Sequence, residues 1–156
     1  MTKQEVFEKF PCGQVKEEIA NHKALNWIGR ILAIIIMVFA VYHSRGTTEL
    51  FAKFIDYAVL VIVLWWTHHI ADPKVFICEK GLVILRGPID LRERFDILFH
   101  EEAYFVFLAY EQIIGFTESW EEIQAVSNSG GLYMMQVDLQ FVAYPDKMKL
   151  IQAISQ

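Results

Sequence analysis

Two apolar runs in the first half of the chain constrain its fold more than any other feature. They are WIGRILAIIIMVFAVYH and FIDYAVLVIVLWWTHHI, separated by a short polar connection. The second contains AVLVIVLWW, which is apolar on every face of a helix, and the rest of a 156-residue chain is too short to bury it in one globule. The runs therefore predict a membrane α-helical hairpin, with spans at about 24–43 and 51–67.

The remaining residues have the composition of water-soluble segments. We expect an N-terminal helical segment at 1–23, the hairpin at 24–70 and a soluble domain at 74–156. The first run follows mixed-charge residues and precedes no cleavage pattern, so we expect a retained span rather than a signal peptide. Basic residues near the spans lie mostly on the terminal sides (Lys16, Lys23, Arg30, Lys74, Lys80 and Arg86) and less in the connection (Arg45 and Lys53). They predict a multi-pass protein of the cytoplasmic (inner) membrane with both termini in the cytoplasm.

The formal net charge of −5 lies on the soluble domain. Nucleic acid and an anionic lipid surface would both repel an acidic domain, so we expect a protein partner and no nucleic acid. Cys12 and Cys78 lack metal-ligand spacing and are expected to be free thiols in a reducing compartment.

Beyond Pro73 the apolar period changes from 3.6 to 2, which predicts β-strands. We expect a hairpin at 75–78 and 82–86 with Gly81 providing the turn conformation, then a charged loop at 89–102. Further strands are expected at 103–110 and 111–119, a strand or short helix at 120–126, and a turn at 127–131.

The last third of the chain has the most regular pattern. Between 132 and 143 the odd positions are mostly apolar (Tyr133, Met135, Val137, Leu139 and Phe141), which predicts a strand with one buried face. Pro145-Asp146 then opens a final helix, in which Met148, Ile151 and Ile154 are expected to pack on the sheet.

Four short motifs resemble those of bacterial two-span membrane proteins with a C-terminal pleckstrin-homology-like (PH-like) domain. They are Glu79-Lys80-Gly81, Tyr110-Glu111-Gln112-Ile113, Gly130-Gly131 and the helix from Asp146. The resemblance implies a mainly-β (α+β) domain, a PH-like barrel of antiparallel strands capped by a C-terminal helix. An unrelated small α+β sandwich is the alternative. PH-like domains are mostly binding platforms, and phosphoinositide-binding relatives use clustered basic residues around the first hairpin. Here only Lys80 and Arg86 lie there, while Arg92 and Arg94 alternate with acidic residues.

One set of side chains has the chemistry of a metal or haem site. His68, His69 and Asp72 follow the second span, and His22 precedes the first. Neighbouring helical residues point about 100° apart, so His68 and His69 do not both face one ion unless the helix ends there. Interfacial histidines without a ligand are the favoured interpretation.

Two further sets are candidates for partner contacts. Asp56 lies inside the second span, where it would pair with Lys53 or contact a partner's span. Trp120 lies among Glu118, Glu121 and Glu122 and would be either an exposed anchor in an acidic patch or a core residue.

The sequence contains no nucleophile signature or phosphate-binding loop, and His100-Glu101-Glu102 has the composition of a solvated loop. We therefore expect a non-enzymatic membrane-anchored adaptor, or a small accessory subunit of a membrane complex, without a cofactor. Its acidic domain would bind a protein partner, and assembly into a homo-oligomer stays open. The alternatives are a lipid-sensing PH-like module and a metal- or haem-containing redox component.

Overall fold

The structure is a computed structural model that describes residues 1–46, 49–69 and 72–155, without the side chains of 64–69 and 98. It divides into two compact units. One is the hairpin unit, Asn21–Asp72, and the other joins Met1–Ala20 to Pro73–Gln156. This division differs from the predicted boundaries at 1–23, 24–70 and 74–156, because Met1–Ala20 belongs to the same unit as Pro73–Gln156.

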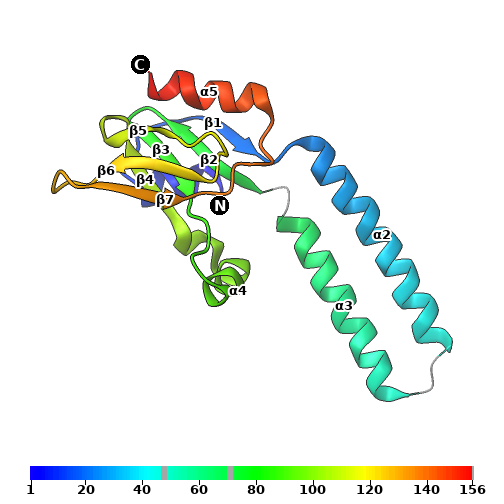
Figure 1. The fold of residues 1–156 in the computed structure, drawn as a ribbon. Helices are drawn as coiled ribbons and strands as arrows, with labels where there is room; N and C mark the ends of the chain where they lie inside the picture. The colour runs from blue at the N-terminus through cyan, green and yellow to red at the C-terminus, as the bar shows by residue number, and fades with distance from the viewer. Residues whose placement is uncertain (47–48, 70–71, 156) are drawn as a thin grey trace. The chain divides into compact units, whose positions relative to one another are not determined.

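The hairpin unit consists of two neighbouring helices, α2 (Lys23–Gly46) and α3 (Leu50–His69) (Figure 1). The buried residues of α2 are Gly29, Ala33 and Ala40, whose spacing places them on one face, where small side chains let helix backbones approach closely. Among the described residues, α2 is the one helix long and apolar enough to cross a membrane.

Most large apolar side chains of this unit are exposed. On α2 they include Trp27, Ile28, Ile31, Ile34, Ile35, Val38 and Phe39, and on α3 they include Phe51, Phe54, Tyr57, Val61 and Ile62. Water-soluble proteins rarely leave such a continuous apolar surface uncovered.

The chain before the hairpin forms a helix and then a strand. Helix α1 (Lys3–Lys9) begins with a capping box between Thr2 and Glu5. Strand β1 (Val15–Ala20) pairs antiparallel with β2 (Pro73–Cys78). The N-terminal segment predicted to be helical thus contains a strand, because pairing with β2 outweighs the helical propensity of the sequence VKEEIA.

Two antiparallel sheets form the soluble unit. The four-stranded sheet has the order β1–β2–β3–β4, with β3 at Gly81–Leu85 and β4 at Phe105–Ala109. The three-stranded sheet has the order β5–β6–β7, at Ile113–Phe116, Glu122–Val126 and Leu132–Gln136. The predicted hairpin of β2 and β3 is confirmed, and the undecided segment 120–126 contains a strand.

An isolated bridge between Arg86 and Val137 joins the end of β3 to the end of β7, in the second sheet. Within the described ranges the ladders do not close into a barrel. The antiparallel sheets and the C-terminal helix are therefore confirmed, whereas a closed PH-like barrel is not.

Gly81 acts through its missing side chain rather than through a turn conformation. A Cβ atom at this position would lie 2.1 Å from the carbonyl oxygen of Leu108 and 2.8 Å from the Cα of Ala109, both on β4. Among the described glycines, positive φ angles occur instead at Gly13 and Gly130, the latter in the confirmed turn at 127–131.

The four-stranded sheet is buried on both faces. Its inner face contributes Ile19, Val75, Ile77, Leu82, Ile84 and Leu108 to a core shared with the second sheet and α5. On its other face, Phe76, Cys78, Val83, Leu85 and Phe105 pack with Val6 and Cys12 from the N-terminal segment. Residues on both sides of the hairpin in sequence therefore share one core.

Helix α5 (Tyr144–Ile154) lies over one end of the strands (Figure 1). Its buried residues are Leu150 and Ala153. Of the residues predicted to pack on the sheet, Ile154 packs against the core and Ile151 is exposed, so the packing face is partly rotated. Lys149 of α5 pairs with Glu17 of β1. The strand predicted over 132–143 ends at Gln136, and Phe141 is exposed.

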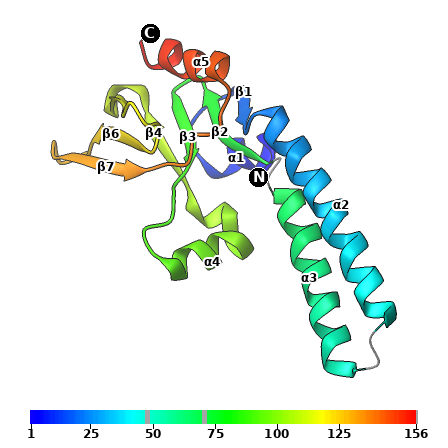
Figure 2. The same cartoon turned by 45° about the vertical axis from the view of Figure 1, so that its right-hand side comes forward.

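Between β3 and β4 the chain forms helix α4 (Leu91–His100), which projects from the sheets (Figure 2). A 3₁₀ helix, η1 (Glu101–Tyr104), leads into β4, and a second one, η2 (Tyr110–Gln112), leads into β5. The loop predicted at 89–102 is therefore wrong. Asp90 caps α4, since its carboxylate accepts a hydrogen bond from the backbone N–H of Glu93 at 2.7 Å.

Candidate interaction surfaces

Helix α4 carries an apolar stripe on its outer face. Leu91, Phe95 and Phe99 are spaced by four residues, so they lie on one side of the helix, and they are 72%, 62% and 72% exposed. Ile89, just before the helix, is exposed as well. We call these four residues the α4 stripe. It is a cluster of large, exposed apolar side chains on one element.

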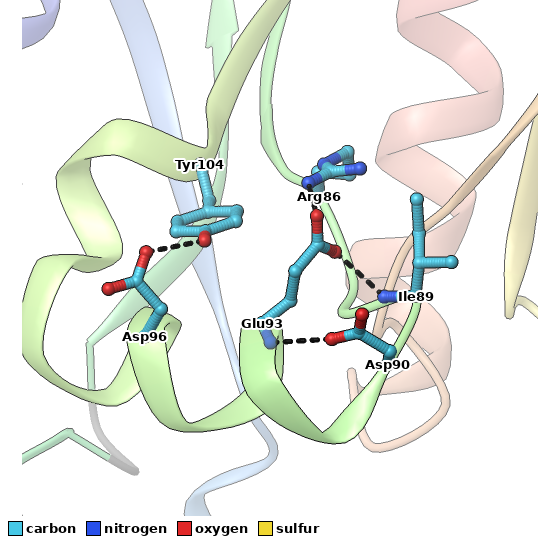
Figure 3. Close-up of polar contacts among 6 residues, drawn as sticks. All are labelled: Arg86, Ile89, Asp90, Glu93, Asp96 and Tyr104. Carbon is cyan, nitrogen blue, oxygen red and sulfur yellow. Dashed lines mark hydrogen bonds and ion pairs between the residues drawn. The ribbon is translucent and has the colours of Figure 1, made fainter.

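Polar contacts on the other side of α4 fix the helix to the rest of the unit (Figure 3). The guanidinium of Arg86 donates to the carboxylate of Glu93 at 2.8 Å, and the backbone N–H of Ile89 donates to its other oxygen at 2.9 Å. The hydroxyl of Tyr104 donates to Asp96 at 2.6 Å. We call the set Arg86, Glu93, Asp96 and Tyr104 the α4 clamp. It determines which face of the helix points outward.

The clamp shifts the acidity of its members. The backbone N–H of Ile89 and then Arg86 lower the pKa of Glu93 below its ordinary value. Hydrogen bonds from Tyr104 and then His100 lower the pKa of Asp96, and the bond to Asp96 raises the pKa of Tyr104. Both carboxylates are thus stabilised in the ionised form that the clamp requires.

The arginines of this region have different roles. Arg86 is held by Glu93 and lies 5.4 Å from the ring centroid of Tyr104, so it is engaged inside the clamp. Because Arg86 is engaged in this way, it is less suited to bind a phosphoinositide headgroup at the first hairpin of the domain. Arg92 and Arg94 are exposed on α4, and within the described residues neither side chain forms a hydrogen bond or an ion pair. They lie on the two flanks of the α4 stripe, given about 100° per residue.

The acidic turn between β5 and β6 contains the predicted partner-binding residues. Glu118 and Glu121 are exposed, and Glu122 is half-buried. Trp120 is packed against the core, where its ring stacks on Phe116 with centroids 4.9 Å apart. The structure therefore gives Trp120 a packing role and leaves the carboxylates at the surface.

Asp56 in the hairpin has a different partner from the predicted Lys53. Its carboxylate lies 3.0 Å from Nδ1 of His43 on the neighbouring helix α2, and its side chain is only 14% exposed. The ring of His43 also stacks on Phe39. Asp56 therefore links the two helices, and the predicted pair of Asp56 with Lys53 does not form.

The predicted histidine cluster is only partly described. The side chains of His68 and His69 lie outside the described ones, and Asp72 follows a gap in the description. His22 caps α2, where its Nδ1 accepts from the backbone N–H of Ala24 at 3.0 Å. Within the described residues, no group of three or more His, Cys, Asp or Glu side chains has the arrangement of a metal site.

Glu101, predicted to lie in a solvated loop, is buried. Its carboxylate accepts a hydrogen bond from Lys74 at 2.9 Å, and the two side chains are 9% and 15% exposed. The pair joins β2 to the segment after α4. It is a structural contact rather than an acid–base group open to a substrate.

Sequence reasoning missed the α4 stripe, the α4 clamp and the role of His43. The signal for α4 was present, since Asp90 and Glu93 have the spacing of a helix start and Leu91, Phe95 and Phe99 follow at helical intervals. No comparable signal connects His43 to Asp56, which belong to different helices.

Comparison of the chain with protein-family models, with curated proteins and with solved structures gives no match.

Proposed function

We propose that this protein is a non-catalytic, membrane-anchored adaptor or accessory subunit. Helices α2 and α3 cross the bilayer as a hairpin, and the soluble unit binds a protein partner on the cytoplasmic side. One observation carries the proposal: an apolar hairpin is inserted between two strands that pair with each other, with Ala20 opposite Pro73 at the end of the β1–β2 ladder.

The pairing of β1 with β2 constrains the topology. If α2 alone crossed a membrane, β1 and β2 would end on opposite sides and could not share a ladder. A crossing by α2 therefore requires a return crossing by α3, whose exposed side chains as far as Ile62 are largely apolar. The alternative of a cleaved signal sequence would remove α1 and β1 and uncover Phe76 and Cys78.

The basic residues support a cytoplasmic soluble unit. Lys16 precedes α2, Lys23 is its first residue and Lys74 lies near the start of β2, whereas Arg45 lies near the end of α2 and Lys53 near the start of α3. Cytoplasmic flanks of spans carry the excess of Lys and Arg. The same orientation places the free thiols of Cys12 and Cys78 in a reducing compartment.

The adaptor role follows from the surface of the soluble unit. We propose that the two sheets and α5 are a PH-like binding platform, an assignment supported by antiparallel strands that end in a C-terminal helix. The carboxylates of Glu118 and Glu121 favour a basic protein partner through charge complementarity. The second sheet also exposes Ile114, Leu132 and Met134, and an apolar centre with a polar rim is typical of protein interfaces.

Membrane topology is tested with single cysteines in the full-length protein. Burial, and then the neighbouring thiol of Cys12, raise the pKa of Cys78 to about 12, and both native thiols are buried, so background labelling of the folded protein is expected to be low. Glu49→Cys is expected to react with a membrane-impermeant maleimide in intact cells and Glu118→Cys only in inverted vesicles. Reaction of both on the same side would contradict the two-span arrangement.

The adaptor role is tested by purifying the tagged protein at its native level in a mild detergent and identifying the proteins that accompany it. A stoichiometric partner is expected, and the double variant Glu118→Lys, Glu121→Lys is expected to lose it. Glu111→Lys, an exposed carboxylate on η2, is the matched control and should retain the partner. A partner kept by the double variant would move the binding surface elsewhere, and a protein that purifies alone would contradict the adaptor role.

A further inference from the structure

We infer that Cys12 and Cys78 are an oxidant-sensitive thiol pair, which a hydroperoxide converts to a disulfide when the N-terminal helix α1 detaches from the sheet. They are the two cysteines of the chain, and the hairpin unit lies between them in sequence. This property of the soluble unit depends neither on the membrane anchor nor on the partner proposed above.

The backbone brings the two cysteines together on the face of the four-stranded sheet that packs against the N-terminal segment. The backbone N–H of Lys80 donates to the carbonyl of Cys12 at 3.1 Å, and the N–H of Glu79 donates to the carbonyl of Gln14 at 3.0 Å. The chain that leads into β1 therefore runs beside the end of β2. A disulfide needs Cα atoms only about 4.4–6.8 Å apart, so it requires neighbouring segments of this kind. Both side chains are fully buried in the same cluster.

The thiols interact with each other and are protected while the unit is closed. Burial, and then a hydrogen bond with the thiol of Cys12, raise the pKa of Cys78 to about 12, so Cys78 stays protonated at neutral pH. The Sγ of Cys12 lies 3.4 Å from the carbonyl oxygen of Gly13 and 3.9 Å from that of Val6. Peroxides react with exposed thiolates, so oxidation of this pair requires that the cover opens.

Helix α1 forms part of the cover and has a small buried surface. Val6 is its buried residue, and Met1 and Phe10 beside the helix are partly buried. Terminal segments with so few buried side chains open more readily than the core of a domain. Opening of α1 exposes Cys12, which follows the helix directly, while Cys78 stays in β2.

The reaction consists of two balanced steps. The thiolate of Cys12 attacks one oxygen of the hydroperoxide, the O–O bond breaks, and a sulfenic acid forms with release of water or an alcohol. When α1 closes again, the sulfur of Cys78 displaces the hydroxyl group of the sulfenic acid, the S–S bond forms, and the hydroxyl group leaves with the thiol proton as water. Two thiols are oxidised and one peroxide is reduced. Cellular thiols reverse the bond by exchange, as is usual for redox-sensing disulfides in a reducing compartment.

The disulfide changes the connectivity of the soluble unit. It joins the segment that leads into β1 to the end of β2, and so it ties together the two strands that flank the hairpin unit. Cross-links act mainly by restricting the open chain, and the restriction grows with the length of the closed loop. Oxidation is therefore expected to slow the opening of the soluble unit.

The test treats the full-length protein in detergent micelles with hydrogen peroxide, blocks the remaining thiols by alkylation, and measures intact mass and peptide maps. Val6→Ala removes the buried anchor of α1 and should open the helix more often. Phe7→Ala is the matched control, because Phe7 is exposed on the same helix. Cys78→Ala, treated with the sulfenic-acid reagent dimedone, identifies the thiol that is attacked first.

We expect the loss of two hydrogen atoms from a single chain, a pair of peptides joined through Cys12 and Cys78, and reversal by dithiothreitol. The rate of oxidation should rise severalfold in Val6→Ala and stay unchanged in Phe7→Ala. Dimedone should label Cys12 in the Cys78→Ala variant.

Two results would overturn the inference. In the first, peroxide yields only sulfinic acid, bonds between chains or unreacted thiols, even in Val6→Ala. In the second, Val6→Ala and Phe7→Ala are oxidised at equal rates, which would remove the role of α1. Dibromobimane, which becomes fluorescent when it bridges two close thiols, gives a measurement on the unsubstituted protein that does not depend on the folding of a variant. Bridging of Cys12 to Cys78 is expected, and labelling of single thiols without bridging would contradict the pair.

Discussion

Ala20 and Pro73 face each other at the end of the β1–β2 ladder, although the whole hairpin unit, Asn21–Asp72, lies between them in sequence. The soluble unit is therefore discontinuous, and its first strand is made before the hairpin. If the hairpin spans a membrane as we propose, this pairing requires an even number of crossings. It also predicts that substitutions in the first twenty residues affect the stability of the unit downstream.

Ile19→Ala tests the integration of β1. Ile19 is buried on the inner face of the four-stranded sheet, so its truncation should lower the free energy of unfolding by about 2–5 kcal/mol. Lys16→Ala, at an exposed position of the same strand, should change it by less than about 0.5 kcal/mol. Urea unfolding in micelles, followed through fluorescence that includes Trp120, gives both values. If Ile19→Ala lowered the free energy of unfolding as little as Lys16→Ala does, residues 15–20 would be a surface helix instead of a buried strand.

Gly81→Ala tests the close approach of β3 and β4. The added Cβ would collide with the backbone of Leu108 and Ala109, which cannot move aside like a side chain, so a loss of about 1–3 kcal/mol or more is expected. Gly115→Ala is the matched control, a strand glycine whose Cβ would meet no atom within 4 Å. The same urea titration compares them, and a neutral Gly81→Ala would show that the strands lie further apart.

The contact between His43 and Asp56 is tested with a double-mutant cycle. Polar contacts between membrane helices couple by about 0.6 kcal/mol on average and up to about 1.7 kcal/mol, and His43→Ala with Asp56→Ala should fall in that range. The cycle of Lys53→Ala with Asp56→Ala should be additive within about 0.3–0.5 kcal/mol. Unfolding in mixed detergent, measured by circular dichroism, supplies the energies. Coupling to Lys53 instead of His43 would reverse the assignment.

The α4 clamp should weaken in acid. The pKa of Glu93 is lower in the folded protein than in the unfolded chain, so its carboxylate stabilises the clamp fully above the ordinary Glu pKa of about 4.3 and loses that effect as the pH falls through the folded pKa. Asp96, whose pKa is also lowered, acts in the same direction.

Hydrogen exchange of α4 amides, corrected for the intrinsic effect of pH, measures this change. Glu93→Gln should exchange faster than the unsubstituted protein at neutral pH, and the difference should disappear in acid. Glu118→Gln serves as the control and should leave α4 unchanged. A difference between Glu93→Gln and the unsubstituted protein that persists at all pH values would mean that the clamp does not depend on the ionised carboxylate.

Three of the sequence patterns predicted their elements correctly. The apolar runs form α2 and α3, the segment around Gly81 forms two paired strands, and the chain after Pro145 is helical. In each case the local sequence, through its hydrophobic periodicity or its turn-forming residues, favours the same structure as the tertiary contacts do.

The errors have separate physical causes. The segment VKEEIA favours a helix locally, and only a partner located beyond the hairpin turns it into a strand. The charges of α4 suggested a loop, because the contacts that neutralise Glu93 and Asp96 come from Arg86 and Tyr104 on neighbouring segments. At the candidate sites, the exposed carboxylates of the acidic turn were readable from composition, whereas the packing of Trp120 on Phe116 depends on the fold.

The shared core has a consequence for biosynthesis. Val6, Cys12 and Ile19 leave the ribosome before the strands that cover them, and at about 5–20 residues per second the intervening hairpin takes about 3–10 s to translate. During that interval the nascent N-terminus has an unpaired strand and an apolar helix face without a partner. The soluble unit therefore cannot complete folding until the hairpin has been synthesised and its two ends have been brought together. If the hairpin spans a membrane as we propose, insertion is a checkpoint for folding.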